Sequence, residues 1–504
     1  MNTRQTHAAK ATRREVDARE LCLRAARHQQ NGRLQEALAD YQRAAALTPN
    51  DPTIHYKIGT VRDMARHPEP ALESFARAIE LRPDFAWAHF NRGLVLSDLK
   101  RQDEALRAFD RAIALQPDFI HAYQNRATAL EKLGRYEEAL QGYEQAIALR
   151  PAYADAQRGR AYVLWKLGRY KESLQGYEQA AMLNPDDAQA RYGKALQLLT
   201  LGNYPNGFEC YEARWRCATP AAYQRNFPQA QWRGEPLKHQ RILLHAEQGY
   251  GDCLQMLRYL PLVKQQAAQV ILELPRELQP LLGPIAQGIK VVDFASTPPP
   301  FDLHCPLMSL PLAFGTQLAS VPAPVPYLSA PPERLAKWRK RLPRSPHLRV
   351  GLVWSGRSSY LDDAQRSLAL ELLAPLFASE AIAFVSLQRD YRERDLATLA
   401  RLPLERIDDG IDDFGDTAAA MEQCDLIISS DTAAAHLAGA LGKPVWILLP
   451  FVADWRWLLA RNDSPWYPSA RLFRQRHMGD WDGLIAEVHE ALRERVSAGL
   501  LPHA

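Results

Sequence analysis

The strongest constraint on the fold of this chain is a spacing of 34 residues. Large aromatic residues recur at this interval in the first half of the sequence, and a proline follows each of them eight residues later. Such a period predicts an array of helix–turn–helix units that bury their apolar faces only against neighbouring units. We therefore expect a helical scaffold over about residues 15–218, with any chemistry in the rest of the chain. The aromatic residues are Tyr41, Phe75, Phe109, Tyr143 and Tyr177.

One unit of the array can be read from residues 120–151. Apolar and small residues recur there at helical spacing, Gly134 is expected to end the first helix, and Tyr136 to begin the second. The proline after the second helix ends it, because proline cannot donate the next backbone hydrogen bond. In the unit at 52–83, Arg66-His67-Pro68 replaces the turn glycine, and an irregular turn is expected.

The segments GRYEEAL and GRYKESL give residues 15–218 a resemblance to the tetratricopeptide repeat family. This resemblance implies a concave surface for a peptide or protein partner, with Asn91, Asn125 and Arg126 as candidate contacts. The alternative for these three side chains is that they hold adjacent helices together. Residues 1–14 are polar, lie outside the period and are expected to be disordered.

The composition narrows the class of protein. The chain has 504 residues, enough for two or three domains, with 47% hydrophobic and 24% charged residues. A net charge of +4 is too small to indicate nucleic-acid binding. The six cysteines form no CxxC pair, so neither a zinc site nor a disulfide framework is predicted. No secretory signal or membrane-spanning run is visible, and we expect a cytoplasmic protein.

From Arg241 onward, short apolar runs alternate with helix-like stretches. Two successive series of this kind predict an α/β region with two parallel, doubly wound, Rossmann-like sheets and a cleft at the carboxyl ends of their strands. The expected boundaries are 236–325 for the first half, 326–348 for a linker with a basic helix, and 349–495 for the second half. The expected strands are 241–246, 270–274, 290–294, 301–305, 349–354, 381–388, 425–430 and 444–450.

The first strand of this region runs into the loop EQGYGD. Gly249 and Gly251 allow a tight turn before a helix, and Asp252 would lie near the start of that helix. The third glycine of a dinucleotide-binding fingerprint is absent, so that kind of site is not supported. Helix capping is the alternative role for Asp252.

The segment DLIISSDTAAAHLAGALGKPVW carries a sharper signal. A buried strand ends in a polar turn and leads into a helix whose first N–H groups and positive dipole end would bind an anion. Thr432 would add a hydroxyl, and His436 lies one turn further on the same face. In the alternative, Asp431 caps the helix and His436 belongs to the core.

Three segments resemble glycosyltransferase family 9, the heptosyltransferase-like enzymes: the loop ending in GYGD, GLVWSG, and DTAAAHLAGALGKPVW. Bacterial proteins that join tetratricopeptide repeats to such a domain are more similar still. The resemblance spans about residues 240–490 and implies a GT-B fold that binds a nucleotide-sugar. The arrangement is also similar to that of the O-linked N-acetylglucosamine transferases.

The resemblance also assigns roles to individual residues. It implies that Asp252 is the catalytic base and that Ala433 replaces a glycine common in heptosyltransferases. The residues implied to bind the donor are Ser355, Arg366, Gln388, Asp431, Thr432, Ala433 and His436.

No DxD motif stands at a predicted strand end, and we expect metal-independent, inverting transfer with no cofactor. The adjacent acids Asp362–Asp363 and Asp412–Asp413 are expected to be solvated. The basic stretch 334–349 is expected to be a solvated connecting helix, with contact to an anionic membrane surface as the alternative. The leading hypothesis is therefore a glycosyltransferase whose repeats recruit the acceptor. The competing hypothesis is a non-catalytic interaction scaffold with a degenerate GT-B domain.

Overall fold

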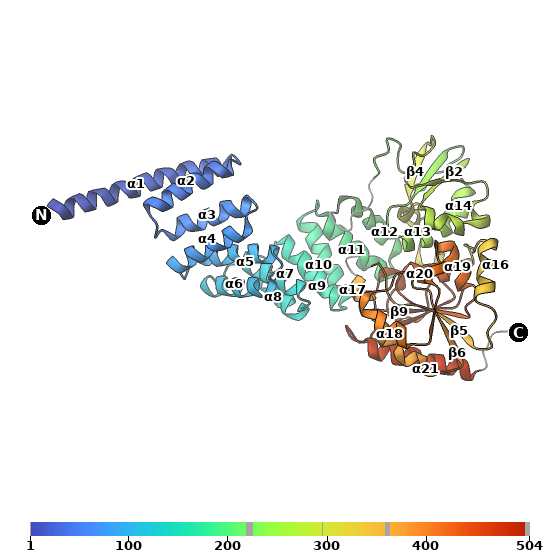
Figure 1. Ribbon diagram of the computed structural model, residues 1–504. Coiled ribbons are helices and arrows are strands. Elements are labelled where there is room, and N and C mark those ends of the chain that lie inside the picture. Colours follow the sequence, from blue (N-terminus) through green and yellow to red (C-terminus); the bar gives the residue numbers. More distant parts are fainter. Residues whose placement is uncertain (1, 218–224, 295, 358–362, 499–504) are drawn as a thin grey trace. The chain divides into compact units, whose positions relative to one another are not determined.

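The computed structural model describes residues 2–217, 225–294, 296–357 and 363–498. The chain forms two compact units, Met1–Asp186 and Asp187–Ala504. Figure 1 shows that the first unit is helical and that both sheets belong to the second. Within the described ranges, no helix has the length and apolar character needed to cross a membrane.

The first unit is a succession of antiparallel helix pairs. Each second helix from α2 to α10 ends two residues before the proline that the period predicts, as α4 ends at Leu81 before Pro83. The helices are α1 (Asn2–Gln30), α2 (Leu34–Leu47), α3 (Pro52–Met64), α4 (Pro68–Leu81), α5 (Ala86–Asp98), α6 (Gln102–Leu115), α7 (Ile120–Lys132), α8 (Tyr136–Leu149), α9 (Ala154–Lys166) and α10 (Tyr170–Leu183).

The periodic aromatic residues are the core of these pairs. Phe75 is fully buried, and its ring lies so close to Gly59 that a Cβ there would meet it at 2.7 Å. Phe109 lies against Gly93 in the same way, at 2.5 Å. The glycines therefore let each pair of helices approach around a large ring.

Two expectations for this unit differ from the structure. The turn at Arg66 is regular: Arg66 adopts a left-handed conformation with φ 60°, close to the 74° of Gly134 in the equivalent turn, and makes equivalent backbone hydrogen bonds. Helix pairing imposes this conformation on a residue that rarely adopts it. The segment 1–14 is helical from Asn2 onward, because it is rich in good helix formers such as alanine, arginine and lysine.

The second unit contains two parallel sheets. The four-stranded sheet has the order β3-β2-β1-β4, and the six-stranded sheet has the order β10-β9-β8-β5-β6-β7. Its strands are β1 (Arg241–His245), β2 (Gln269–Leu274), β3 (Lys290–Asp293), β4 (Leu303–Pro306), β5 (Leu348–Val353), β6 (Ile382–Ser386), β7 (Leu404–Arg406), β8 (Leu426–Ser430), β9 (Val445–Leu449) and β10 (Ala470–Arg474). Its helices from the first sheet onward are α13 (Tyr250–Met256), α14 (Leu260–Lys264), α15 (Leu310–Ala313), α16 (Pro332–Arg341), α17 (Asp363–Arg366), α18 (Leu396–Arg401), α19 (Phe414–Met421), α20 (Ala433–Ala440) and α21 (Trp481–Ser497).

The second unit begins with the last predicted helix pair, α11 (Ala188–Thr200) and α12 (Tyr204–Tyr211), and a short 3-10 helix, η1 (Glu212–Arg216). Tyr204 accepts a hydrogen bond from the Trp466 indole at 3.0 Å, and its ring packs edge-on against Trp455. Both tryptophans are buried. The pair is therefore part of the same core as the sheets.

The basic helix α16 packs on α19 through ion pairs. Arg334 and Lys337 each lie 2.9 Å from the buried carboxylate of Asp416, which also accepts from the Trp338 indole. Arg341 pairs with Asp409. Acidic side chains of the fold thus pair with Arg334, Lys337 and Arg341 of this stretch.

Candidate functional site

The site candidates lie where the strand order of each sheet reverses. In the six-stranded sheet the reversal falls between β5 and β8, and in the four-stranded sheet between β1 and β4. Ligands of open parallel sheets bind at the carboxyl ends of strands beside such a reversal. Ser355 follows β5, Asp431 follows β8, and Asp252 lies in α13, directly after β1.

The two predicted loops touch each other. A Cβ on Gly251 would lie 2.8 Å from Cδ2 of His436 and 3.6 Å from Cα of Ala433. The start of α13 therefore rests on the start of α20, and any side chain at position 251 would push them apart. The structure brings the Asp252 loop together with Ala433 and His436.

The start of α20 has the features of an anion site. Thr432 is the N-cap in an extended conformation, and its hydroxyl lies 3.2 Å from Ser429 Oγ instead of capping the helix. No described residue accepts a hydrogen bond from the backbone N–H of Ala433 or Ala434, and both residues are partly exposed. Arg366 donates from Nη1 to the carbonyl oxygen of Asp431 at 2.9 Å, which places a guanidinium beside the helix start.

Two hydroxyls near this turn are buried. Ser355 Oγ and Ser430 Oγ make no hydrogen bond with any described residue. Gln388 is buried and braces the loop after β5: its Nε2 donates to the carbonyl oxygens of Ser355 and Asp390, and its Oε1 accepts from the Ser355 N–H. Its amide therefore shapes the loop around Ser355.

Asp252 is bound on both sides. Its Oδ2 accepts from the Gly249 N–H at 3.0 Å, so it does cap α13, and its Oδ1 accepts from the guanidinium of Arg456. Burial raises the pKa of Asp252, and Arg456 partly offsets that increase. The Asp252 side chain retains 22% exposure.

Arg456 is the functional candidate that the sequence did not reveal. It is buried beyond β9 and donates to Asp252, to Asp454 at 2.9 Å and to Gln255. It lies within the segment LLPFVADWRWLLARNDSPWY, in which no local pattern marks this arginine as functional. This arginine links the helix of the first sheet to the loop beyond β9.

Asp431 and His436 are both buried and electrostatically perturbed. Burial and the nearby Asp454 carboxylate raise the pKa of Asp431 to about 6. Burial and then Arg456 hold the pKa of His436 well below its usual range, so the ring is neutral. His436 bonds through Nδ1 to the Tyr467 hydroxyl at 2.8 Å and stacks on Trp457.

The two pairs of adjacent aspartates, Asp362–Asp363 and Asp412–Asp413, are not all solvated as expected. Asp363 is buried and pairs with Arg392, and its Oδ1 lies 3.5 Å from Arg366 Nε, so it is not a solvated loop charge. Asp362 lies outside the described residues. Asp412 is exposed and Asp413 caps α19. In the described part of the chain, no three His, Cys, Asp or Glu side chains converge as a metal site would require.

The three candidate groove residues all have partners within the first unit. Asn91 donates to the Tyr56 hydroxyl at 3.0 Å, and Arg126 pairs with Asp110 at 2.6 Å, so both contacts join different helices. Asn125 donates to the carbonyl of His121 in its own helix. Each of the three side chains is partly exposed.

Comparison with known proteins identifies the repeats. Models of the tetratricopeptide repeat match residues 28–62, 86–119, 108–141, 132–168 and 163–215. The chain therefore contains tetratricopeptide repeats, as predicted. Protein FlbA of Caulobacter vibrioides is 27% identical over 307 residues, which cover 56% of this chain and 51% of FlbA. The chain thus spans about half the length of this curated relative.

Three similar solved structures each cover between 34% and 39% of this chain. YrrB, described as a tetratricopeptide repeat protein with an unusual peptide-binding site, is 24% identical and covers 38% of this chain and 97% of its own, with a TM-score of 0.33. PilF of Pseudomonas aeruginosa is 18% identical and covers 39% and 90%, with a TM-score of 0.36. MamA of Desulfovibrio magneticus RS-1 is 20% identical and covers 34% and 97%, with a TM-score of 0.33.

Proposed function

We propose that the second unit is a glycosyltransferase of the GT-B class that transfers a sugar from a nucleotide-sugar donor. The observation that carries the proposal is the contact between α13 and α20 at the two strand-order reversals. This contact joins a carboxylate whose side chain is 22% exposed to a helix start with free N–H groups and an adjacent guanidinium.

In this proposal the diphosphate of the donor binds the N–H groups of Ala433 and Ala434, with Arg366 and Thr432 beside it. The helix dipole and the guanidinium stabilise the leaving diphosphate in the role that a divalent cation has elsewhere. Asp252 accepts the proton of the acceptor hydroxyl, and attack opposite the leaving group inverts the sugar. The tetratricopeptide repeats recruit a protein or peptide that carries, or brings, the acceptor.

One observation favours the scaffold alternative. Asp252 is held by Arg456, and Asp431 and Thr432 are each only 8% exposed. A degenerate domain would keep such contacts for stability alone, and the chain would then act only through its repeats.

Thermal unfolding against a panel of nucleoside diphosphates and nucleotide-sugars, with EDTA present, separates the two hypotheses. A ligand at 100 times its Kd stabilises the native state by about 2.7 kcal/mol, so one nucleotide class should raise the Tm. Arg366→Ala should weaken that binding roughly ten- to hundredfold, because a charge-assisted hydrogen bond contributes about 1.5–3 kcal/mol. The matched control is Arg401→Ala, which removes an exposed pair with Glu371 and should leave nucleotide binding unchanged. A flat response to the whole panel would favour the scaffold.

A further inference from the structure

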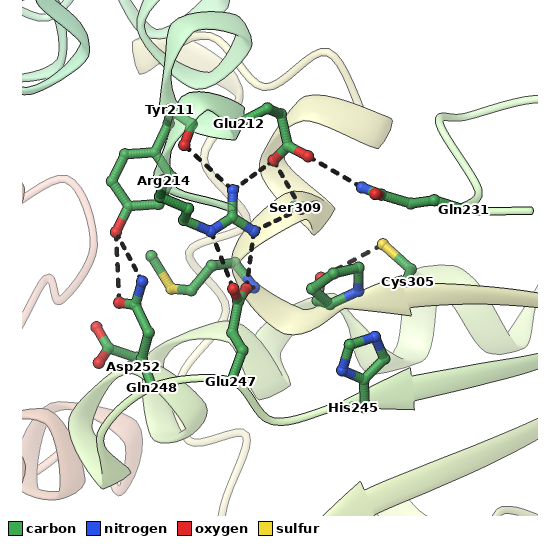
Figure 2. Close-up of polar contacts among 12 residues, drawn as sticks. Tyr211, Glu212, Arg214, Gln231, His245, Glu247, Gln248, Asp252, Cys305 and Ser309 are labelled. Carbon is green, nitrogen blue, oxygen red and sulfur yellow. Dashed lines mark hydrogen bonds and ion pairs between the residues drawn. The ribbon is translucent and has the colours of Figure 1, made fainter. Parts of the chain in front are cut away.

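A buried cluster of ion pairs and hydrogen bonds lies near Asp252, and the transfer mechanism proposed above does not use it. Figure 2 shows that Arg214, which is fully buried, lies at its centre. Its guanidinium donates to both carboxylate oxygens of Glu247 at 2.9 Å, to Glu212 at 2.6 Å and to the Ser309 hydroxyl at 2.8 Å. One cation is thus paired with two carboxylates, of which Glu247 is buried and Glu212 is partly exposed.

The members of this network come from three separate segments of the second unit. Arg214 and Glu212 belong to η1, directly after the last helix of the repeat region. Glu247 follows β1 and precedes Asp252 by five residues. Ser309 lies beyond β4, where the Met308 N–H also donates to Glu247 at 3.0 Å. The network therefore ties η1 to both loops at the reversal of the first sheet.

A second polar contact also joins the end of the repeat region to the Asp252 loop. The Tyr211 hydroxyl and the Gln248 amide are 3.2–3.3 Å apart. Figure 2 shows the hydrogen bonds between Tyr211 and Gln248.

The loop that carries Asp252 is also held by packing, since Gly251 lies against α20 and the Tyr250 ring lies 5.2 Å from the Phe414 ring. Gly249 and Gly251 contribute no side chains, and Gly249 and Tyr250 are at least partly exposed. Its polar contacts include those of Glu247 and Gln248 at its start and that of Asp252 with Arg456. A carboxylate as deeply buried as Glu247 stays in place only while its counter-charge remains.

We propose that Arg214 is a positioning residue for the Asp252 loop: through Glu247 it holds the start of α13 against α20. The last helical segment of the repeat region is then a structural part of the candidate site. The role of Arg214 in positioning the loop does not depend on the proposed function. Only the expected effect of Arg214 on sugar transfer rests on that function.

Hydrogen–deuterium exchange of the full chain tests the claim about the loop. In Arg214→Lys, which keeps the charge but loses the paired bonds to Glu247, amides of residues 246–256 should exchange at least tenfold faster, with the six-stranded sheet unchanged. The control Arg225→Lys alters a partly buried ion pair with Glu273 on the same sheet and should leave those amides unchanged. Unchanged exchange in 246–256, or faster exchange throughout the second unit, would overturn the proposal.

A second variant covers misfolding. Glu247→Gln keeps the size of the side chain, and the same local increase in the exchange rate of residues 246–256 is expected. If Arg214→Lys does not fold, the outcome of this variant decides.

The effect on sugar transfer is measured separately. Arg214→Lys should lower kcat at least tenfold with the KM for the donor unchanged, since the donor binds beside α20. A wild-type protein that binds no nucleotide would refute the proposed function and leave the exchange result to judge this inference.

Discussion

Replacing Arg456 by methionine removes the charge that bridges Asp252 and Asp454 while it keeps most of the side-chain volume. The arginine side chain is 7% exposed, and the two carboxylates are 22% and 37% exposed. Breaking a fully buried ion pair costs about 3–5 kcal/mol. Solvent screens the two partly exposed carboxylates, so we expect a loss of about 2–3 kcal/mol.

The loss should depend on pH in a defined direction. Without Arg456 the pKa of Asp252 rises further above its unfolded value, because burial then acts without its main offset. The penalty is absent below the ordinary aspartate range, where the carboxyl is protonated in both states, and is complete above the raised folded pKa. The difference in stability between the variant and the wild type should therefore be larger at pH 8 than at pH 5.

Arg258→Met is the matched control. Arg258 is 4% exposed, but its partners are the carbonyl oxygens of Gln255, Pro322 and Trp466 and the hydroxyl of Tyr327. Its loss leaves polar groups unpaired and exposes no carboxylate, so the resulting loss of stability should be nearly the same at both pH values.

Thermal unfolding at pH 5 and pH 8 measures both variants. An unfolding entropy of about 2.1 cal/mol/K per residue gives a unit of roughly 300 residues a shift of about 1.5 °C per kcal/mol. The Tm of Arg456→Met should therefore fall by about 3–5 °C at pH 8 and by clearly less at pH 5. An equal fall at both pH values would show that Arg456 contributes by packing, and the electrostatic reasoning would be refuted.

Two further predictions concern the contact of the helices and the charge at the helix start. Gly251→Ala places a Cβ 2.8 Å from the His436 ring, so it should lower the stability of the protein by about 1–3 kcal/mol and weaken nucleotide binding. The control Gly249→Ala places a Cβ 3.4 Å from an Asp252 oxygen and should affect binding less. Equal nucleotide affinities of the two variants by calorimetry would contradict this prediction. A bound diphosphate should raise the pKa of Asp431 beyond about 6, so binding takes up a proton and affinity falls as the pH rises from 6 to 8. Calorimetry in buffers of different ionisation enthalpy measures the proton, and Asp431→Asn should remove the dependence.

The sequence predicted the elements whose signal is local. Prolines and turn residues set the ends of the repeat helices, and continuous apolar runs marked central strands such as β8 and β9. The strands β7 and β10 were missed because both lie at edges of their sheet, where fewer apolar residues are needed. In β7 only Leu404 is buried.

The candidate site was predictable only where its residues follow strands directly. Asp252 and Asp431 stood out because a polar turn followed an apolar run in each case. The pairing of Arg456 with Asp252 joins positions 204 residues apart, and nothing near Arg456 in the sequence signals it. Arg66 shows the same limit at short range, since the packing of two helices sets its left-handed conformation.

In the proposed transferase, the Asp252 loop and the start of α20 form one catalytic site. The test is hydrolysis of the nucleotide-sugar that binds best, in which water takes the sugar in place of the acceptor and nucleoside diphosphate is released; ³¹P NMR in excess EDTA follows the release. We expect the wild type to release nucleoside diphosphate and Asp252→Asn to release it at least a hundredfold more slowly, with donor affinity retained. Equal rates for the two proteins, or no release by either with the donor bound, would contradict it.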